Sequence, residues 1–194
     1  MGETIRGADW DGRDIVGEKF ERVTFVDVDL TEASLRGASF DECSFRDTKF
    51  NASTHADTAF ANCSFSTCDF FDATFTSCKL VGSQFQRCTF KLLDVRGGDW
   101  SFVTLRGADL RGVSFVDVRM REIDLTDANC EGAKLRGGDL GGAWLHQTDL
   151  SGCDLRGSGL PEIDPLATKL AGAIVDVRQA VAIAQGLGLD VRPE

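Results

Sequence analysis

The sequence of 194 residues contains no tyrosine, three prolines and two histidines, and no apolar run approaches the ~18 residues of a membrane-spanning helix. We therefore expect no transmembrane segment and no signal peptide, and a cytoplasmic protein whose seven cysteines are reduced thiols. Basic residues are also scarce, since 21 Lys and Arg stand against 31 Asp and Glu, a net charge of −10. This excess of acid disfavours direct nucleic-acid binding and favours a basic partner, although an acidic surface also serves solubility alone.

Phenylalanine, by contrast, is abundant and regularly spaced. The segment Phe60–Phe90 reads FANCSFSTCDFFDATFTSCKLVGSQFQRCTF, with an aromatic residue or leucine at every fifth position. A helix repeats every 3.6 residues and a strand every 2, so this period predicts a chain that turns at regular intervals. A small residue lies two positions before each large one, which predicts one large and one small inward side chain in each unit of five.

The period continues without insertion or deletion from Phe20 to Leu160. No charged residue occupies either inward position between Val23 and Leu160. Because unpaired buried charges are costly, this charge-free pattern indicates which side chains leave water. Such a long uninterrupted period is typical of a repeat architecture.

Units such as Ala33-Ser-Leu-Arg-Gly37 and Ala108-Asp-Leu-Arg-Gly112 resemble the pentapeptide repeat, written A-[DN]-L-x-x, and the resemblance covers roughly residues 5–175. It implies an all-β fold, a right-handed quadrilateral β-helix with one unit on each side and twenty residues per coil. Residues twenty apart would then stack, which predicts inner ladders such as Phe25, Phe45, Phe65 and Phe85. At strand spacing, eight such coils would form a rod about 38 Å long.

The two ends depart from the repeat, and the sequence predicts a β-helix over residues 1–175 and a C-terminal segment over 176–194. Glu3, Arg13 and Glu18 occupy small inward positions, so residues 1–19 are expected to form a ragged N-terminal cap. At the other end Asp176 and Gln179 have the spacing of a helix N-cap and its N3 partner, which predicts a short α-helix ending near Gly186.

The ending AGAIVDVRQAVAIAQGLGLDV resembles the C-terminal segment of the MfpA and Qnr group, the gyrase-interacting members of the pentapeptide repeat family. That resemblance implies a homodimer joined through the C-termini, and the alternative is a helix that only plugs its own rod. The expected dimerisation residues are Val177, Ala180, Val181, Ala184 and Leu187.

Catalytic and metal-binding patterns are not evident, and we expect no enzyme activity, no cofactor and no metal. His146 lies at an outward position, whereas His55 occupies a large inward position as a hydrogen-bonded core residue or a local packing defect. Six cysteines fall at small inward positions. The register stacks Cys43 on Cys63 and Cys68 on Cys88, at about one strand spacing, which lies within the range of Cα separations of disulfides, but a cytoplasmic chain would keep them reduced.

Acidic residues are unevenly distributed if the rod has four sides. The units centred on positions 10, 30, 50 and onward to 170 carry nine acids and four bases, and we call this side the acidic face. Its expected partner-binding residues are the column Asp9, Asp29, Asp69, Asp109 and Asp149, with Glu32 and Asp72 beside it.

The resemblance implies that such a rod mimics a DNA duplex and occupies the DNA-binding surface of DNA gyrase, thereby modulating supercoiling and protecting against fluoroquinolones. A duplex carries one negative charge per roughly 1.7 Å, far denser than this rod, so mimicry must be confined to one or two faces. The alternative is a structural or adaptor rod with a different protein partner, on which the aspartates solvate the surface.

Overall fold

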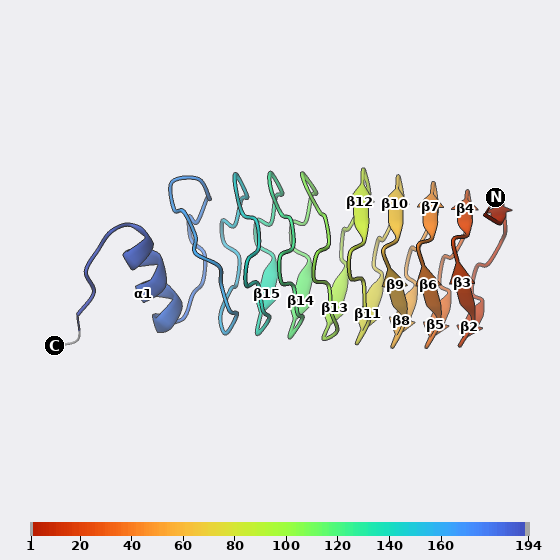
Figure 1. Ribbon diagram of the computed structural model, residues 1–194, viewed down its shortest axis with the longest axis horizontal. Coiled ribbons are helices and arrows are strands. Elements are labelled where there is room, and N and C mark those ends of the chain that lie inside the picture. The colour runs from red at the N-terminus through yellow and green to blue at the C-terminus, as the bar shows by residue number, and fades with distance from the viewer. Residues whose placement is uncertain (1, 193–194) are drawn as a thin grey trace.

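The computed structural model describes residues 2–192 as an elongated rod of stacked coils with a single helix at its C-terminal end (Figure 1). Three-residue strands pair in parallel with strands of the next coil, and every pairing joins residues twenty apart, as in Ile5 with Phe25. Four sides of five residues therefore make one coil. This register confirms the right-handed quadrilateral β-helix predicted from the sequence resemblance.

Three sides of the rod form parallel sheets. The first contains β1 (Thr4–Arg6), β4 (Thr24–Val26), β7 (Ser44–Arg46), β10 (Ser64–Ser66) and β12 (Gln84–Gln86). The second contains β2 (Asp14–Val16), β5 (Ser34–Arg36), β8 (Thr54–Ala56), β11 (Thr74–Thr76), β13 (Asp94–Arg96), β14 (Ser114–Val116) and β15 (Lys134–Arg136). The third contains β3 (Lys19–Glu21), β6 (Ser39–Asp41) and β9 (Ala59–Ala61). The fourth side, the acidic face, is joined by single bridges such as Asp9 to Asp29.

Each corner of the coil is made by a residue with left-handed backbone geometry. The second residue after every large inward position has a positive φ, without exception from Gly7 to Gly157. Glycine adopts this region freely, whereas other residues lose about 1–2 kcal/mol there. Many corners nevertheless carry Asp or Asn, the side chains that tolerate this geometry best. The regular turning expected from the period of five is thus produced by one residue with left-handed backbone geometry in every unit.

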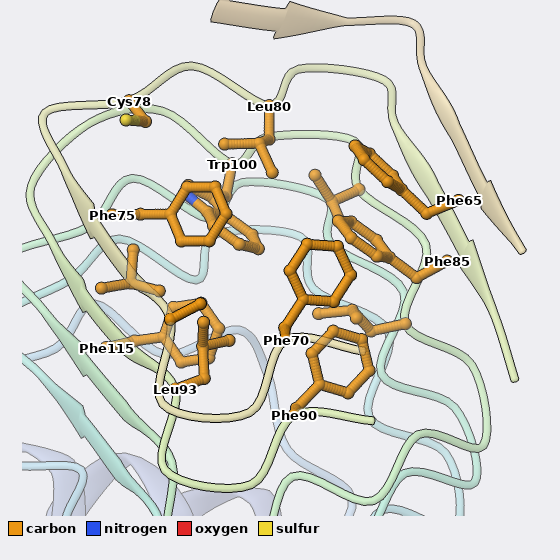
Figure 2. Packing of buried hydrophobic residues seen from close by; sticks show 14 of the residues in the cluster. Phe65, Phe70, Phe75, Cys78, Leu80, Phe85, Phe90, Leu93, Trp100 and Phe115 are labelled. Carbon is orange, nitrogen blue, oxygen red and sulfur yellow. The ribbon is translucent and has the colours of Figure 1, made fainter. Parts of the chain in front are cut away.

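Phenylalanine ladders fill the interior, as predicted. The rings of Phe25, Phe45 and Phe65 stack with centroids 4.7 and 4.9 Å apart and nearly parallel planes. Neighbouring ladders meet edge to face, for example Phe65 and Phe70 at 5.6 Å (Figure 2). These separations match the strand spacing and lie within the range that stacked aromatic pairs prefer, and the edge contacts add favourable quadrupole interactions.

His55 lies within this interior and is 2 % exposed. Its ring stacks on Phe75 at 4.1 Å, and Nε2 lies 2.9 Å from the hydroxyl of Ser53. Ser53 donates its own proton to the carbonyl of Phe50, so the imidazole must donate through Nε2, and Nδ1 has no partner. Burial lowers the pKa of His55 to about 3. It is a neutral core histidine with one hydrogen bond.

The N-terminal end is covered by polar side chains at inward positions. The guanidinium of Arg13 lies 4.5 Å from the ring centre of Trp10 and forms an ion pair with Glu18 at 3.0 Å. A cation above an indole face is a favourable electrostatic contact. These charged side chains therefore cover the Trp10 ring at the end of the rod, where no further coil stacks on it.

At the C-terminal end, α1 (Val177–Gly186) begins with the expected capping box of Asp176 and Gln179. The same two side chains attach the helix to the rod. Gln179 Nε2 donates to the carbonyls of Leu155 and Ser158, at 2.6 and 2.8 Å, and Asp176 accepts from the N–H of Gly157. No helix in the described part of the chain is long and apolar enough to cross a bilayer.

The stacking of the coils is interrupted at one place on the acidic face. Single bridges join Asp69 to Thr89 and Asp109 to Asn129, whereas none joins Thr89 to Asp109 within residues 2–192. Figure 1 shows the coil that carries β12 standing apart from the next one. The interior here holds large side chains, because Leu93 fills a small inward position and Trp100 is the largest fully buried side chain (Figure 2).

Gly98 provides a test of the coil packing. A Cβ atom at this position would lie 2.1 Å from the carbonyl oxygen of Cys78, on a backbone with φ +86°. We expect Gly98→Ala to lower the free energy of unfolding by about 2–4 kcal/mol, measured by urea denaturation. Gly97→Ala is the matched control, because its Cβ would make only an ordinary contact with Ser77 Oγ at 3.8 Å, also at a positive φ, and it should cost about 1 kcal/mol. Equal costs would show that the contact with Cys78 is unimportant.

Replacing His55 tests the cost of its burial. The unfolded chain protonates this histidine near pH 6.5 and the folded chain only near pH 3, so its contribution to stability is lost as pH falls through that window. We expect His55→Leu to stabilise the protein by about 1 kcal/mol at pH 7, and by a growing margin between pH 6 and pH 4. Urea midpoints at several pH values measure this difference. His146→Gln, at an exposed position, should leave the pH dependence of the parent in place.

Candidate protein-binding surfaces

The acidic face carries a straight column of side chains, one from each coil. Bridges connect Asp9, Asp29, Lys49, Asp69 and Thr89 in one run, and Asp109, Asn129, Asp149 and Lys169 in a second. The five aspartates that the sequence placed in one column therefore share a side of the rod. The column also contains two lysines, and the interruption between coils divides it.

The aspartates of this column support the turns that follow them. Asp29 accepts a hydrogen bond from the N–H of Thr31 at 3.0 Å, and Asp149 accepts one from Ser151 at 3.0 Å. The same contact recurs on other sides, as in Asp124 with Thr126, and Asn129 makes it with Glu131. These carboxylates satisfy a backbone donor at the corner, so the aspartate of the repeat has a structural role as well as a charge.

Three of the five column aspartates also have a basic partner. Lys49 pairs with Asp29 at 2.9 Å, Lys169 with Asp149 at 3.1 Å, and Arg111 pairs with Asp109 through two nitrogens. Hydrogen bonds from Ser151 and from Lys169 lower the pKa of Asp149 to about 2. The negative potential around these three positions is therefore largely compensated within the protein itself.

Asp69 and Asp9 differ, because neither forms an ion pair within the described residues. Asp69 accepts hydrogen bonds from the amide of Asn51 at 2.8 Å, from the hydroxyl of Thr89 and from the N–H of Phe71. All three donors are neutral, so the carboxylate keeps its full charge at the surface.

Glu32 and Asp72 lie at corners on one edge of the acidic face, each with a positive φ, and likewise have no ion pair in residues 2–192. The sequence analysis did not single out four further uncompensated acids: Asp11 and Glu131, on the face itself, and Asp27 and Asp47, on its other edge. Uncompensated charge is thus concentrated between residues 9 and 72. The register shows that Lys49 and Lys169 fall in the same column as the aspartates, but it does not show which aspartate each lysine contacts.

The C-terminal helix presents a second surface, which is apolar. Val177 is 81 % exposed and Leu187 is 53 % exposed, and Ala180 is also exposed. The other two expected dimerisation residues, Val181 and Ala184, are half-buried. Three further apolar side chains near the C-terminal end, outside the expected set, are also exposed: Ile174, Leu189 and Val191. Clustered exposure of this kind is typical of an interaction site.

No group of three or more potential metal ligands converges anywhere in residues 2–192. His55 is enclosed in the core and His146 lies on the surface far along the chain. The surfaces described above can recognise another macromolecule through charge or apolar contact, and they contain no nucleophile positioned beside a base.

Two family models match this chain. One, described as a pentapeptide repeat region, matches residues 68–145, and one described as pentapeptide repeats (8 copies) matches residues 19–54. Together the matches cover more than half of the chain. No curated protein sequence shows significant similarity to it.

The fold is also found in solved structures. Two trypsin-treated variants of QnrB1, a plasmid-mediated fluoroquinolone resistance protein, superpose with TM-scores of 0.59 and 0.58 at 25% and 24% sequence identity. Each alignment covers 99% of this chain and 99% of the QnrB1 chain. With the twenty-residue register and the family matches, these similarities lead to one assignment: the chain belongs to the pentapeptide repeat family.

Proposed function

We propose that this protein binds DNA gyrase as a DNA mimic, modulates its supercoiling activity and protects it from fluoroquinolones. The observation that carries the proposal is the similarity to QnrB1, a fluoroquinolone resistance protein, over essentially the whole chain. The resemblance of the C-terminal segment to the gyrase-interacting group supports it. This function requires no cofactor and no reaction on the rod, and it places the protein in the cytoplasm with its target.

The charge distribution favours a local form of mimicry. Stacked coils repeat every ~4.8 Å, so one carboxylate per coil is far sparser than the phosphates of a duplex. The charge density is higher over residues 9–72. Here acids without an ion-pair partner occupy the acidic face and both of its edges, as with Asp9, Glu32 and Asp47. This half of the rod is the part we expect to contact a surface that evolved to bind phosphates.

An adaptor rod with a different protein partner is the second candidate. It is favoured by the structural use of the aspartates, which cap turns and pair with bases of neighbouring coils, as Asp149 does with Ser151 and Lys169. In this case the surface charge would serve folding and solubility. Gyrase binding and its response to loss of charge distinguish the two functions.

Neutralising the uncompensated acids tests the mimicry. We expect the combined variant Asp9→Asn, Glu32→Gln, Asp69→Asn and Asp72→Asn to bind gyrase roughly tenfold more weakly, or about 1.4 kcal/mol, and to lose salt dependence. Asparagine preserves the turn, as Asn129 does in the same column. Binding is measured by surface plasmon resonance and inhibition by a supercoiling assay.

Asp124→Asn is the matched control, because Asp124 makes the same turn contact, has no ion pair among the described residues and lies outside the acidic face. It should leave affinity unchanged. Full affinity in the combined variant would exclude mimicry by these residues, and a parent protein that binds neither gyrase subunit would overturn the function itself.

We further propose that two rods join through their C-terminal ends. The apolar surface of α1 and the following residues supports this, because Val177 and Leu187 have no counterpart to cover them in the described chain. A two-fold symmetric contact would bury both copies of the same patch.

Adding charge to this surface should prevent pairing. We expect the variant Val177→Asp with Leu187→Asp to be a monomer by sedimentation velocity, whereas the parent is a dimer, because each dimer would bury four unpaired carboxylates. Val16→Asp is the control, since Val16 is similarly exposed, at 59 %, but lies near the N-terminal end. A double variant that remains dimeric would place the contact elsewhere.

A further inference from the structure

Cys88 differs from the other six cysteines in its access to solvent. Six are buried, whereas Cys88 is partly exposed although it occupies the same small inward position as most of them. Cys88 borders an opening of about 430 Å³ lined also by Thr89, Phe90, Lys91, Asp109 and Arg111.

The opening results from the interruption between coils. Elsewhere on this face the ladder is continuous, as in the bonds from Phe70 N–H to Thr89 and from Leu110 N–H to Asn129. Within residues 2–192, no backbone hydrogen bond joins residues 87–92 to residues 106–111. The coils have separated along one side, and Cys88 lacks the cover that the following coil gives to the buried cysteines.

Cys68 lies one coil away from Cys88 on the intact side. The coils are joined here by the bond from Thr89 N–H to the carbonyl of Cys68, at 3.1 Å, so the two residues are direct neighbours in a parallel ladder. Strand spacing of about 4.8 Å falls within the range of Cα separations that disulfides span. Hydrogen bonding to the Cys68 thiol lowers the pKa of Cys88.

We propose that Cys88 and Cys68 form an oxidation site in which Cys88 reacts with a small hydroperoxide and Cys68 completes a disulfide. The Cys88 thiolate attacks the peroxide oxygen and breaks the O–O bond, which yields a sulfenic acid and, after proton transfer, water or an alcohol. The Cys68 sulfur then displaces hydroxide from the sulfenic acid, forms the S–S bond and gives its proton to the leaving hydroxide. Two thiols are oxidised and one peroxide is reduced.

The chain contains its own comparison pair. Cys43 and Cys63 stack in the same way, and the Cys63 thiol lowers the pKa of Cys43 to about 7. Both residues are only 1 % exposed, and the ladder around them is continuous, as in Ser64 N–H to the carbonyl of Cys43. The pKa is lowered at Cys43 as it is at Cys88, so acidity alone would not favour Cys88. In our proposal, the deciding property is instead the access of peroxide to the cysteine.

The experiment treats the full-length reduced protein with hydrogen peroxide and follows it by intact mass and peptide mapping after alkylation. We expect the loss of two hydrogen atoms per chain, a single disulfide between Cys68 and Cys88, and recovery of both thiols with dithiothreitol. Cys43 and Cys63 should still be alkylated after unfolding.

Serine variants separate the two roles without disturbing the fold, because Ser83 already occupies such an inward position and bonds to the carbonyl of Phe60 at 2.8 Å. Cys68→Ser should stop at a sulfenic acid on Cys88 that dimedone traps. Cys88→Ser should lose the reaction, and Cys43→Ser should react like the parent.

Three results would overturn the proposal. They are oxidation of Cys43 at the same rate as Cys88, an unchanged rate in Cys88→Ser, and a disulfide that joins two chains rather than two coils. Circular dichroism of each variant confirms that the coil is retained, so that a lost reaction reports the missing sulfur. None of these readouts depends on gyrase.

Discussion

Backbone pairing between each residue and the one twenty positions later is the constraint on which this structure depends. Parallel strands of three residues have little stability individually, and they persist because every coil pairs with the coils above and below it. The pairing requires all coils to have the same length, which explains why no insertion interrupts the period. It also aligns like positions, so that inward rings stack and outward charges form columns.

The sequence was sufficient for those parts of the fold that repeat. The charge-free inward positions predicted the core, and the spacing of Asp176 and Gln179 predicted the start of α1. The number of sides came from the family resemblance, because a period of five residues is compatible with other polygons. The interruption next to Cys88 could not be predicted from the sequence, since it depends on how Leu93 and Trp100 pack in the interior.

The candidate site was only partly predictable, for a related reason. The column of aspartates follows directly from the register, but its effective charge depends on side chains from neighbouring coils. Asp29 and Asp69 occupy equivalent positions, yet one contacts a lysine and the other an asparagine and a threonine. A count of charges per side treats them alike, whereas a basic partner would meet a compensated carboxylate in one case and a full charge in the other.

The two ends of the rod are chemically different, and this determines how many neighbours one molecule can acquire. Arg13 and Glu18 place charge over the rings at one end, while the other end terminates in exposed valine and leucine. A rod with an exposed interaction surface at both ends would polymerise into fibres, which is the usual hazard of unpaired strand edges. If two rods join through α1, as proposed, the charged N-terminal ends offer no second contact of this kind, so assembly would stop at a pair with the charged ends outermost.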